Sequence, residues 1–497
     1  MRGDWGGDEM DSESFRLDGY RLIDWIAEYL EHPERYPVLA QVEPGQVERA
    51  LPKEPPEEPE PLEAILQDVE KIIAPGLTHW NHPGFFAYFA ITGSGPGILG
   101  ELLSAAFNVN AMLWRTAPAA TELEELVLGW LRQLLGLPPE FMGLINDTAS
   151  VSSLCAIAAA REALGLRIRE EGLAGRADLP RLRLYTSEQA HSSIEKAAIV
   201  LGLGQAGVKK IAVDEEFRLR SRDLEAAIKK DLKAGCKPFC VVATVGTTST
   251  TSVDPVPEIA DICRRYNLWL HVDAAYAGAA AILPEKRWAL AGCKRADSIV
   301  VNPHKWLFVP IDCSAFYCRH PSILRQAFSL VPEYLRTSEE DRVRNFMDYG
   351  IQLGRRFRAL KLWMVLRAFG AEGLRQRLRD HVALAERFQG WIEASPDFEP
   401  LAPVPFSVVC FRSRPQDLSA CPETEAYLNL LNERMLEAVN GTGDVFLSHT
   451  KINEKFALRL AIGNLGTTEA HVRRAWELLQ EHAMRLDAEL RPATLKD

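Results

Sequence analysis

The sequence predicts an α/β fold whose centre is a mostly parallel sheet covered by helices. Apolar extended runs alternate with helical patterns between about residues 120 and 310. Four runs stand out: LRLYTS (182–187), FCVVATVG (239–246), LWLHVDAAYA (268–277) and SIVVNP (298–303). They are rich in β-branched side chains and almost continuously apolar, as expected for strands buried on both faces. Strands that alternate with helices are typical of a parallel sheet.

The segments between these runs have the apolar spacing of helices. They cover residues 121–136, 151–165, 191–201, 222–234 and 255–266. One turn among them, Gly202-Leu-Gly204-Gln-Ala-Gly207, also matches the glycine pattern of dinucleotide-binding loops. That pattern requires a strand before it and a helix after it. Here the order is reversed, so we interpret these glycines as a helix-ending turn and not as a nicotinamide site.

An N-terminal region of helical character precedes the sheet. Residues 13–31 have the spacing of an amphipathic helix. Its apolar face lies far in sequence from any core segment, so we expect it to pack across a subunit boundary. A proline- and acid-rich connector follows at 53–63, and a second helix follows at about 62–74.

The pattern changes again beyond about residue 380, to a long helix, short strands at 406–412 and 456–463, and a final helix. A chain of 497 residues is expected to form two or three domains. We predict a helical arm that serves dimerisation (1–85), a large domain (86–380) and a small α+β domain (381–497).

Composition excludes several classes of function. The net charge of −11, without a run of Lys or Arg, argues against nucleic acid as a partner. The nine cysteines are scattered and form no Cys-x-x-Cys pair, which predicts reduced thiols and no metal site. The acidic N-terminus lacks a signal core, and no apolar run reaches the ~18 residues of a membrane span. We therefore expect a cytoplasmic protein without a membrane partner.

Two buried strands end in residues that carry chemistry. The strand at 268–273 ends in His271-Val-Asp273-Ala-Ala275. A carboxylate at this place is costly unless it pairs with a cation. The alternative, which this strand alone favours, is that Asp273 caps the following helix.

The next strand ends in Asn302-Pro303-His304-Lys305-Trp306. A lysine beside a histidine and an aromatic ring, just past a buried strand, is well placed for a lowered pKa and Schiff-base chemistry. A surface lysine in a turn is the alternative interpretation. A lysine and an acid at one edge of a sheet are what pyridoxal phosphate (PLP) requires, together with a phosphate site and a group stacked on its ring.

Longer motifs extend this interpretation. HVDAAYAG, NPHKW, DCSAFY and LGRRFRALKLW resemble the PLP-dependent aromatic L-amino-acid decarboxylase family, which includes DOPA, tyrosine, tryptophan and phenylalanine decarboxylases. THWNHPGFFAYF, APAATELE, HSSIEKA and ATVGTTSTTSVD resemble segments of the same family in its order. The likeness covers roughly residues 13–485.

The resemblance implies a fold-type-I PLP enzyme. Its large domain holds a mostly parallel seven-stranded sheet, and it has a helical N-terminal arm and a small α+β C-terminal domain. It implies a homodimer with the active site at the subunit interface. The implied reaction converts tryptophan, tyrosine, DOPA or phenylalanine to the arylalkylamine and carbon dioxide.

The resemblance also implies roles for single residues. Lys305 binds PLP covalently, Asp273 pairs with the pyridine nitrogen, and His191 stacks on one ring face. His191 on its own reads as a structural histidine that caps its helix, and only the motif favours the functional role. The other implied cofactor contacts are Ala275 on the opposite ring face, Thr248 near the ring, and Thr148, Ala149, Ser150 and Asn302 at the phosphate, at a helix N-terminus.

A tyrosine in a mobile loop delivers the proton to the substrate in this family. Val331-Pro-Glu333-Tyr334-Leu335 resembles that loop, and an ordinary packing aromatic is the alternative for Tyr334. His304 is a further candidate, as a proton relay or as a ring beneath the loop. Related aldehyde synthases carry Phe at the loop position, so Tyr334 favours simple decarboxylation.

The resemblance places the aromatic substrate against a mainly aromatic pocket, partly supplied by the partner subunit. Its candidate residues are Trp80, Tyr88, Phe89, Met112 and Gly354.

Two alternative functions are possible on this scaffold. Tyr334 disfavours an aromatic aldehyde synthase, and Gly354 disfavours a histidine decarboxylase. A PLP-binding protein without catalysis is disfavoured by the complete set of Lys305, Asp273, His191 and Tyr334. One departure from the family is the segment GIQ (350–352), about three residues shorter than usual.

Overall fold

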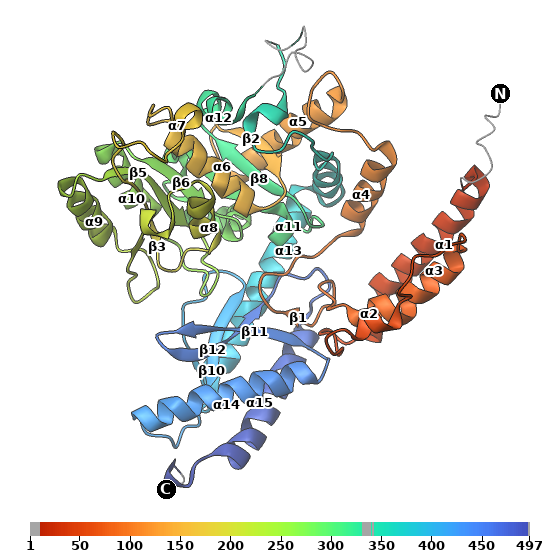
Figure 1. Ribbon diagram of the computed structural model, residues 1–497. Helices are drawn as coiled ribbons and strands as arrows, with labels where there is room; N and C mark the ends of the chain where they lie inside the picture. Colours follow the sequence, from red (N-terminus) through yellow and green to blue (C-terminus); the bar gives the residue numbers. More distant parts are fainter. Residues whose placement is uncertain (1–9, 331–338, 340–341, 496–497) are drawn as a thin grey trace.

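The computed structural model describes residues 10–330, 339 and 342–495 (Figure 1). Within these residues the larger sheet has seven strands, in the order β2-β8-β7-β6-β5-β3-β4. Their bounds are β2 Met142–Asn146, β3 Leu182–Ser187, β4 Val208–Ile211, β5 Lys237–Thr244, β6 Trp269–Asp273, β7 Ser298–Val301 and β8 Ser314–Cys318. Strands β3 to β7 pair in parallel, whereas β8 is antiparallel to both β7 and β2. The predicted mostly parallel, seven-stranded sheet is confirmed.

Helices cover both faces of this sheet, because its central strands are apolar on both sides. On β5, Cys240 and Val242 face one hydrophobic core, whereas Val241 and Ala243 face the other. The first core is closed by α6 (Ala149–Glu162), α8 (Ser193–Val200) and α12 (Pro321–Phe328). The second is closed by α5 (Pro118–Leu135), α9 (Ser221–Lys233), α10 (Val256–Tyr266) and α13 (Ala359–Ala394). The five helices predicted between the strands are confirmed.

Local sequence signals set the ends of these helices. Helix α5 begins at Pro118, where a missing N–H costs nothing, and ends at Gly136 in the left-handed conformation. The glycines that match the dinucleotide pattern lie between α8 and β4, with Gly202 and Gly204 at positive φ. They form a helix-ending turn, as predicted.

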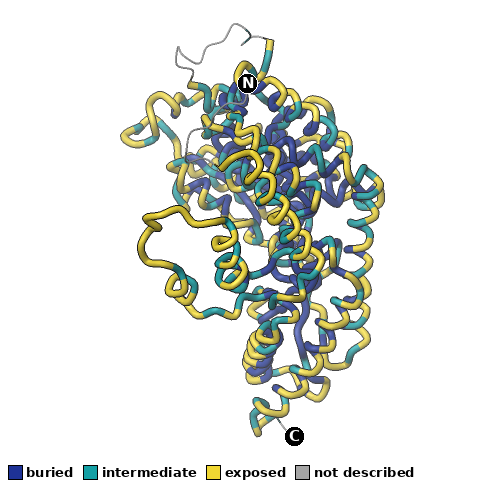
Figure 2. Tube along the Cα trace, turned by 90° about the vertical axis from the view of Figure 1, so that its right-hand side faces the viewer, coloured by how far each residue is buried: buried dark blue, intermediate teal, exposed yellow. Residues whose placement is uncertain are grey.

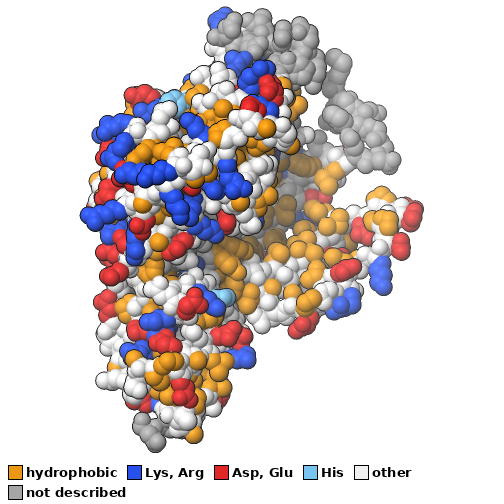
Figure 3. All heavy atoms as spheres, turned by 60° about the vertical axis from the view of Figure 1, so that its left-hand side comes forward, with side chains coloured by type: hydrophobic (Ala, Val, Ile, Leu, Met, Phe, Trp, Pro, Cys, Tyr) orange, Lys and Arg blue, Asp and Glu red, His pale blue; other side chains and the backbone are white. Residues whose placement is uncertain are grey.

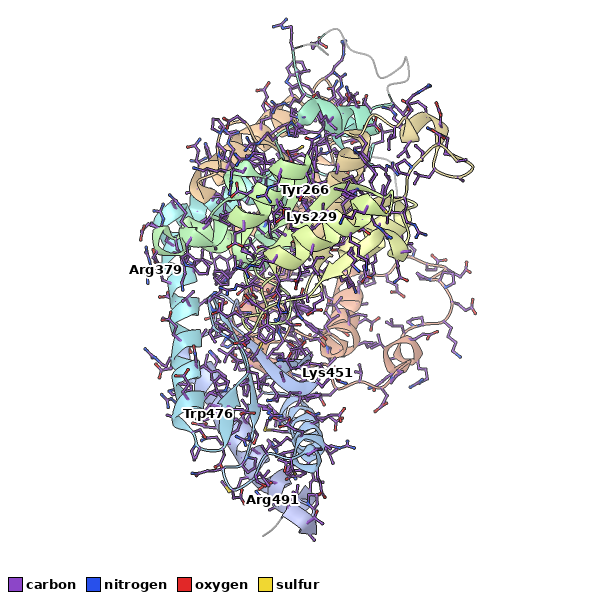
Figure 4. All side chains as sticks on the ribbon, turned by 90° about the vertical axis from the view of Figure 1, so that its left-hand side faces the viewer. Lys229, Tyr266, Arg379, Lys451, Trp476 and Arg491 are labelled. Carbon is purple, nitrogen blue, oxygen red and sulfur yellow. The ribbon has the colours of Figure 1, made fainter. Side chains whose placement is uncertain are left out.

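Polar contacts join neighbouring helices on the surface. Glu225 on α9 accepts a hydrogen bond from the Tyr266 hydroxyl on α10 at 3.0 Å and pairs with Lys229 at 3.1 Å. Figure 4 shows Lys229 and Tyr266 next to each other on these two helices. The contacts hold the α9–α10 layer together on the face that the second core covers.

A second sheet forms the C-terminal part of the molecule. In the described residues it has five strands, in the order β1-β11-β12-β10-β9. Its bounds are β1 Phe85–Phe86, β9 Phe398–Pro400, β10 Val408–Ser413, β11 Phe446–Ile452 and β12 Lys455–Ala461, with α14 (Pro422–Gly441) and α15 (Glu469–Leu490) packed on it. Strand β1 pairs with β11, and α13 runs through residue 380. Segments on both sides of the predicted domain boundaries are thus physically connected.

The N-terminal arm projects from the rest of the molecule (Figure 1). It contains α1 (Ser12–Glu31), α2 (Gln46–Ala50) and α3 (Leu62–Asp68), and the helix predicted at 13–31 is confirmed. No residue of α1 is buried; Phe15 is 66% exposed and Tyr20 is 63% exposed. The connector after α2 is exposed along nearly its whole length (Figure 2). The apolar face of α1 is therefore open in a single chain.

A second helix also exposes apolar side chains. Helix α4 (Gly95–Phe107) presents Leu99, Leu102, Leu103 and Phe107, each more than 40% exposed. Figure 3 shows hydrophobic side chains lining the hollow between the arm and the rest of the molecule. Contiguous apolar surface of this kind is typical of a protein interface.

The remaining expectations from composition concern thiols, metals and membranes. All nine cysteines are free and seven of them are buried. Among the described residues, no cluster of three or more His, Cys, Asp and Glu side chains could hold a metal ion. In the same part of the chain, no helix is both long and apolar enough to cross a membrane.

Candidate active site

The carboxyl ends of β5, β6 and β7 bring the predicted site residues together. Asp273, the last residue of β6, lies opposite Thr244 on β5 and Val300 on β7. The loops after β6 and β7 bind each other, because the Asn302 N–H donates to the Ala275 carbonyl at 3.0 Å. The Lys305 N–H donates in turn to the Asn302 carbonyl at 2.9 Å. The acid and the lysine therefore stand at one edge of the sheet.

Lys305 and Asp273 influence each other electrostatically. Desolvation lowers the pKa of Lys305, and the nearby Asp273 carboxylate opposes that shift. Asp273 is buried, and its Oδ1 accepts the N–H of Ala275, two residues later, at 3.1 Å. A buried carboxylate requires a cation or several donors. Asp273 thus closes its own turn and still presents a negative charge to the region of Lys305.

His191 lies at the start of α8 and faces the same pair. Its Nδ1 accepts the Ser193 N–H at 3.2 Å and contacts the Ser193 hydroxyl at 2.8 Å, so the neutral ring carries its proton on Nε2. Its pKa is lowered mainly by desolvation and then by the charge of Lys305, while Asp273 raises it. The histidine therefore holds the first turn of its helix and also lies within electrostatic range of both predicted cofactor residues.

An aromatic stack forms one wall beside Lys305. The Tyr276 ring stacks on Phe89 at 4.0 Å and on Trp306 at 4.9 Å between centroids. The Lys305 Nζ lies 5.0 Å from the centroid of Phe89. The Tyr276 hydroxyl is fixed by Ser407 at 2.6 Å. This wall is rigid, apolar and next to the lysine amine.

Arg459, on β12, is a functional candidate that the sequence reasoning missed. Its Nε donates to the Ser249 carbonyl at 2.9 Å, and its Nη1 donates to the Ser448 hydroxyl at 3.0 Å. Its Nη2 is buried without a hydrogen-bond partner among the described residues, and desolvation lowers its pKa. The available signal was a single arginine within the apolar strand FALRLAIG. A buried cation with a free donor is suited to an anionic group.

The predicted phosphate residues lie at the N-terminus of α6. Thr148 is the N-cap, and the first backbone N–H groups of a helix have no partner within it. Asn302, at the end of β7, is buried and its Oδ1 has no partner among the described residues. Its Nδ2 lies 3.3 Å from the Nε2 of His304. The unpaired N–H groups at the start of α6 fit a phosphate group at this place.

His304 is buried and both of its ring nitrogens have partners. Its Nδ1 accepts the Cys313 N–H at 2.9 Å, and its Nε2 faces Asn302. Desolvation, followed by the charge of Lys305, lowers its pKa to about 4. This neutral ring lies against the Asn302 amide.

The residue predicted beside the cofactor ring and the residues predicted for the substrate pocket lie in separate parts of the chain's fold. Thr248 is exposed in the turn after β5, and Trp80 stacks with the half-exposed Tyr88 at 5.7 Å. Met112 and Gly354 both lie next to Asn110. Tyr334 and the rest of Val331–Leu335 lie outside the described residues.

The residues at this sheet edge fit PLP. A desolvated lysine, a buried acid, an imidazole beside both, and a helix N-terminus with a buried amide supply the groups that the cofactor requires. The acid and the lysine are held by neighbouring strands, so their separation is set by the sheet. The arrangement can hold a pyridinium ring and a phosphate at the same time.

Known proteins are similar to this chain in sequence and in fold. Residues 44–414 match the family described as the pyridoxal-dependent decarboxylase conserved domain. The chain is 42% identical to tyrosine decarboxylase 4 of Petroselinum crispum, over 95% of this chain and 94% of the relative. It is 40% identical to the phenylacetaldehyde synthase of a Rosa hybrid cultivar, over 95% and 94% respectively. A crystal structure of Oryza sativa TDC with PLP and tryptamine has a TM-score of 0.92 and 38% identity, covering 97% of this chain and 100% of that one.

Proposed function

We propose, from the premise that this chain belongs to the pyridoxal-dependent decarboxylase family, that it decarboxylates an aromatic L-amino acid to the arylalkylamine and carbon dioxide. Membership makes it a PLP-dependent carboxy-lyase. The observation that carries the proposal is the placement of Lys305 and Asp273 at the ends of neighbouring strands, close enough for the Asp273 charge to act on Lys305, beside the Phe89–Tyr276 wall.

The roles of the cofactor-binding residues follow from their positions. PLP, when bound, supplies an electron sink for the bond that breaks at the substrate α-carbon. Lys305 holds it covalently and is displaced by the substrate amine. Asp273 keeps the proton on the pyridine nitrogen, because a buried carboxylate favours a cation next to it. His191 and Ala275 cover the two ring faces, with Thr248 beside the ring.

The other end of the cofactor is held by the start of α6. Thr148, Ala149 and Ser150 bind the phosphate through N–H and hydroxyl groups, and Asn302 assists. His304 lies against the Asn302 amide and acts by packing there. We assign His304 this positioning role in preference to a proton relay, because the Cys313 N–H occupies its Nδ1.

Two residues act on the substrate itself. Tyr334 delivers the proton to the α-carbon after carbon dioxide has left. Arg459 offers its free Nη2 to the substrate carboxylate and, through Ser249, fixes the small sheet against the turn after β5.

The substrate class is supported by the walls of the site and by the relatives. Trp80, Tyr88 and Phe89 supply flat apolar surface, Met112 and Gly354 are the other pocket residues, and part of the pocket comes from the partner subunit. The similar proteins include one named for tyrosine and one solved with tryptamine. An aromatic amino acid suits this pocket better than histidine, which is smaller and more polar.

An aldehyde synthase is the second candidate function, because one relative is a phenylacetaldehyde synthase. Such an enzyme adds oxidative deamination to decarboxylation and so releases ammonia and peroxide. The tyrosine at position 334 favours simple decarboxylation.

We also propose a cytoplasmic homodimer with the active site at the subunit interface. The open apolar faces of α1 and α4 support this assembly, since contiguous apolar side chains on two helices are costly in water. In this arrangement residues 1–85 form the dimerisation arm, 86–380 the cofactor domain and 381–497 the small domain.

One experiment tests the proposed function. Purified protein with PLP is incubated with tryptophan, tyrosine, DOPA, phenylalanine, histidine and glutamate, and carbon dioxide, amine and peroxide are measured separately. We expect amine and carbon dioxide in equal amounts from at least one aromatic amino acid. Peroxide in the same amount as carbon dioxide would instead identify an aldehyde synthase, and turnover of glutamate or histidine alone would contradict the proposed substrate class.

A further inference from the structure

The start of the predicted phosphate site contains a carboxylate. Asp147 stands between β2 and α6, directly before the N-cap Thr148. Its Oδ1 accepts the Thr148 N–H at 2.5 Å and the Thr148 hydroxyl at 3.3 Å. The Thr148 hydroxyl makes no capping bond to its own helix. Both donors that Thr148 could offer to a phosphate are thus directed to Asp147.

The other oxygen of Asp147 is held by the short segment that precedes Gly354. The Gln352 Nε2 donates to Asp147 Oδ2 at 3.2 Å. The two preceding residues also lie next to β2 and α6. The backbone of Ile351 contacts the Cys155 sulfur, and Gly350 lies next to the Asn146 side chain. Gln352 is neutral, so it fixes the carboxylate without cancelling its charge.

Arg358, a cation on which the charge of Asp147 acts, is already paired. The Arg358 guanidinium binds Asp312, since its Nε donates to the Asp312 Oδ1 at 2.7 Å. Asp312 therefore neutralises most of the charge that Arg358 could lend to Asp147. The helix N-terminus attracts an anion, and a carboxylate at its first residue opposes a second one.

We infer that Asp147 weakens the binding of the cofactor phosphate, by competing for the Thr148 donors and by repelling the phosphate charge. The inference rests on the proposed phosphate site. The phosphate of PLP carries about two negative charges near neutral pH. The holoenzyme then releases its cofactor more readily than the helix N-terminus alone would allow, so its occupancy follows the PLP concentration.

The test compares PLP with pyridoxal, which lacks the phosphate, in binding to wild-type and variant apoenzyme. Asp147→Asn removes the charge and keeps an oxygen next to the Thr148 N–H. Asp147→Ser is a second variant that keeps an acceptor if the first folds poorly. Asp223→Asn removes the same charge from the exposed start of α9 and is the matched control. Affinities are measured from the absorbance of the bound cofactor and from competition by inorganic phosphate.

We expect both Asp147 variants to bind PLP about fivefold more tightly, the effect of one partly exposed charge. Inorganic phosphate should compete more strongly in these variants, and the affinity for pyridoxal should stay unchanged, as should every value for Asp223→Asn. Unchanged or weaker PLP binding in both variants, while the wild type still prefers PLP to pyridoxal, would overturn the role of Asp147 alone. A wild type that binds pyridoxal as well as PLP would overturn the phosphate site and this inference together.

Discussion

The guanidinium of Arg459 stands 5.5 Å from the centroid of the Phe89 ring, and the amine of Lys305 stands 5.0 Å from the same centroid. One aromatic side chain thus lies beside two desolvated cations from different parts of the fold. Lys305 follows β7 of the large sheet, whereas Arg459 lies on β12 of the small sheet. Phe89 thus connects Lys305, the proposed cofactor lysine, with the small sheet.

Replacing Arg459 by Gln should reduce kcat/KM by roughly 10- to 100-fold, because a charged hydrogen bond to the substrate is lost. Arg459→Lys should recover part of this loss, since it keeps the charge. Steady-state kinetics give the change, and the absorbance of bound PLP should remain in both variants. An Arg459→Gln enzyme with wild-type kcat/KM would show that the free Nη2 does not meet the substrate.

Replacing Tyr334 by Phe should shift the products from the amine towards aldehyde, ammonia and peroxide. Without the phenol, the proton reaches the α-carbon more slowly and oxygen can compete. The ratio of amine to peroxide per carbon dioxide measures the shift. Tyr349→Phe, outside the predicted loop, is the control. If the ratio is the same in Tyr334→Phe and the wild type, the loop assignment is wrong.

Acid should destabilise the protein through its buried histidines. Desolvation lowers the pKa of His82, His271, His304 and His381 to about 4. In the unfolded chain the pKa of histidine is about 6.5, so unfolding takes up protons between these values. The contribution of these neutral histidines to the free energy of unfolding is therefore complete above pH 6.5 and is lost as the pH falls towards 4. Urea unfolding at several pH values measures it, and a free energy of unfolding that is constant from pH 7 to 4.5 would contradict the assignment.

A buried ion pair connects two of the motifs read from the sequence. Arg355 of LGRR donates to Glu124 of APAATELE at 2.6 Å and to the Ile145 carbonyl at 2.9 Å. Both side chains are almost fully buried. Glu124→Ala should lower the free energy of unfolding by about 3–5 kcal/mol, because it leaves Arg355 uncompensated. Chemical denaturation tests this, and Glu125→Ala, at an exposed neighbour, should cost less than about 1 kcal/mol. Equal losses in the two variants would contradict a special role for the buried pair.

The sequence predicted the central strands of the large sheet because they are apolar on both faces. Strands β3, β5, β6 and β7 begin within about two residues of their predicted positions. Strands β2 and β8 were not predicted as strands. They are only five residues long, and β2 also contains Gly143 and Asn146, which interrupt its apolar run. The pairing of β1 with β11 connects residues about 360 positions apart, which local patterns cannot show.

The chemistry at the sheet edge was predictable for a related reason. Asp273 ends one buried strand and Lys305 follows the next, and the ends of parallel strands meet in space. Arg459 and Asp147 were missed because their importance depends on partners. The Nη2 of Arg459 lacks a partner, and Asp147 accepts the hydrogen bonds that Thr148 donates. Neither property exists until the two sheets and the start of α6 are assembled.

Reduction of the holoenzyme with borohydride, followed by peptide mass mapping, tests the central claim most directly. Borohydride makes the link between PLP and its lysine permanent, so the modified peptide identifies the residue. We predict one pyridoxyl group per chain, on Lys305, and none in Lys305→Ala. A pyridoxyl group on another lysine, or an unmodified Lys305 in active enzyme, would contradict the account.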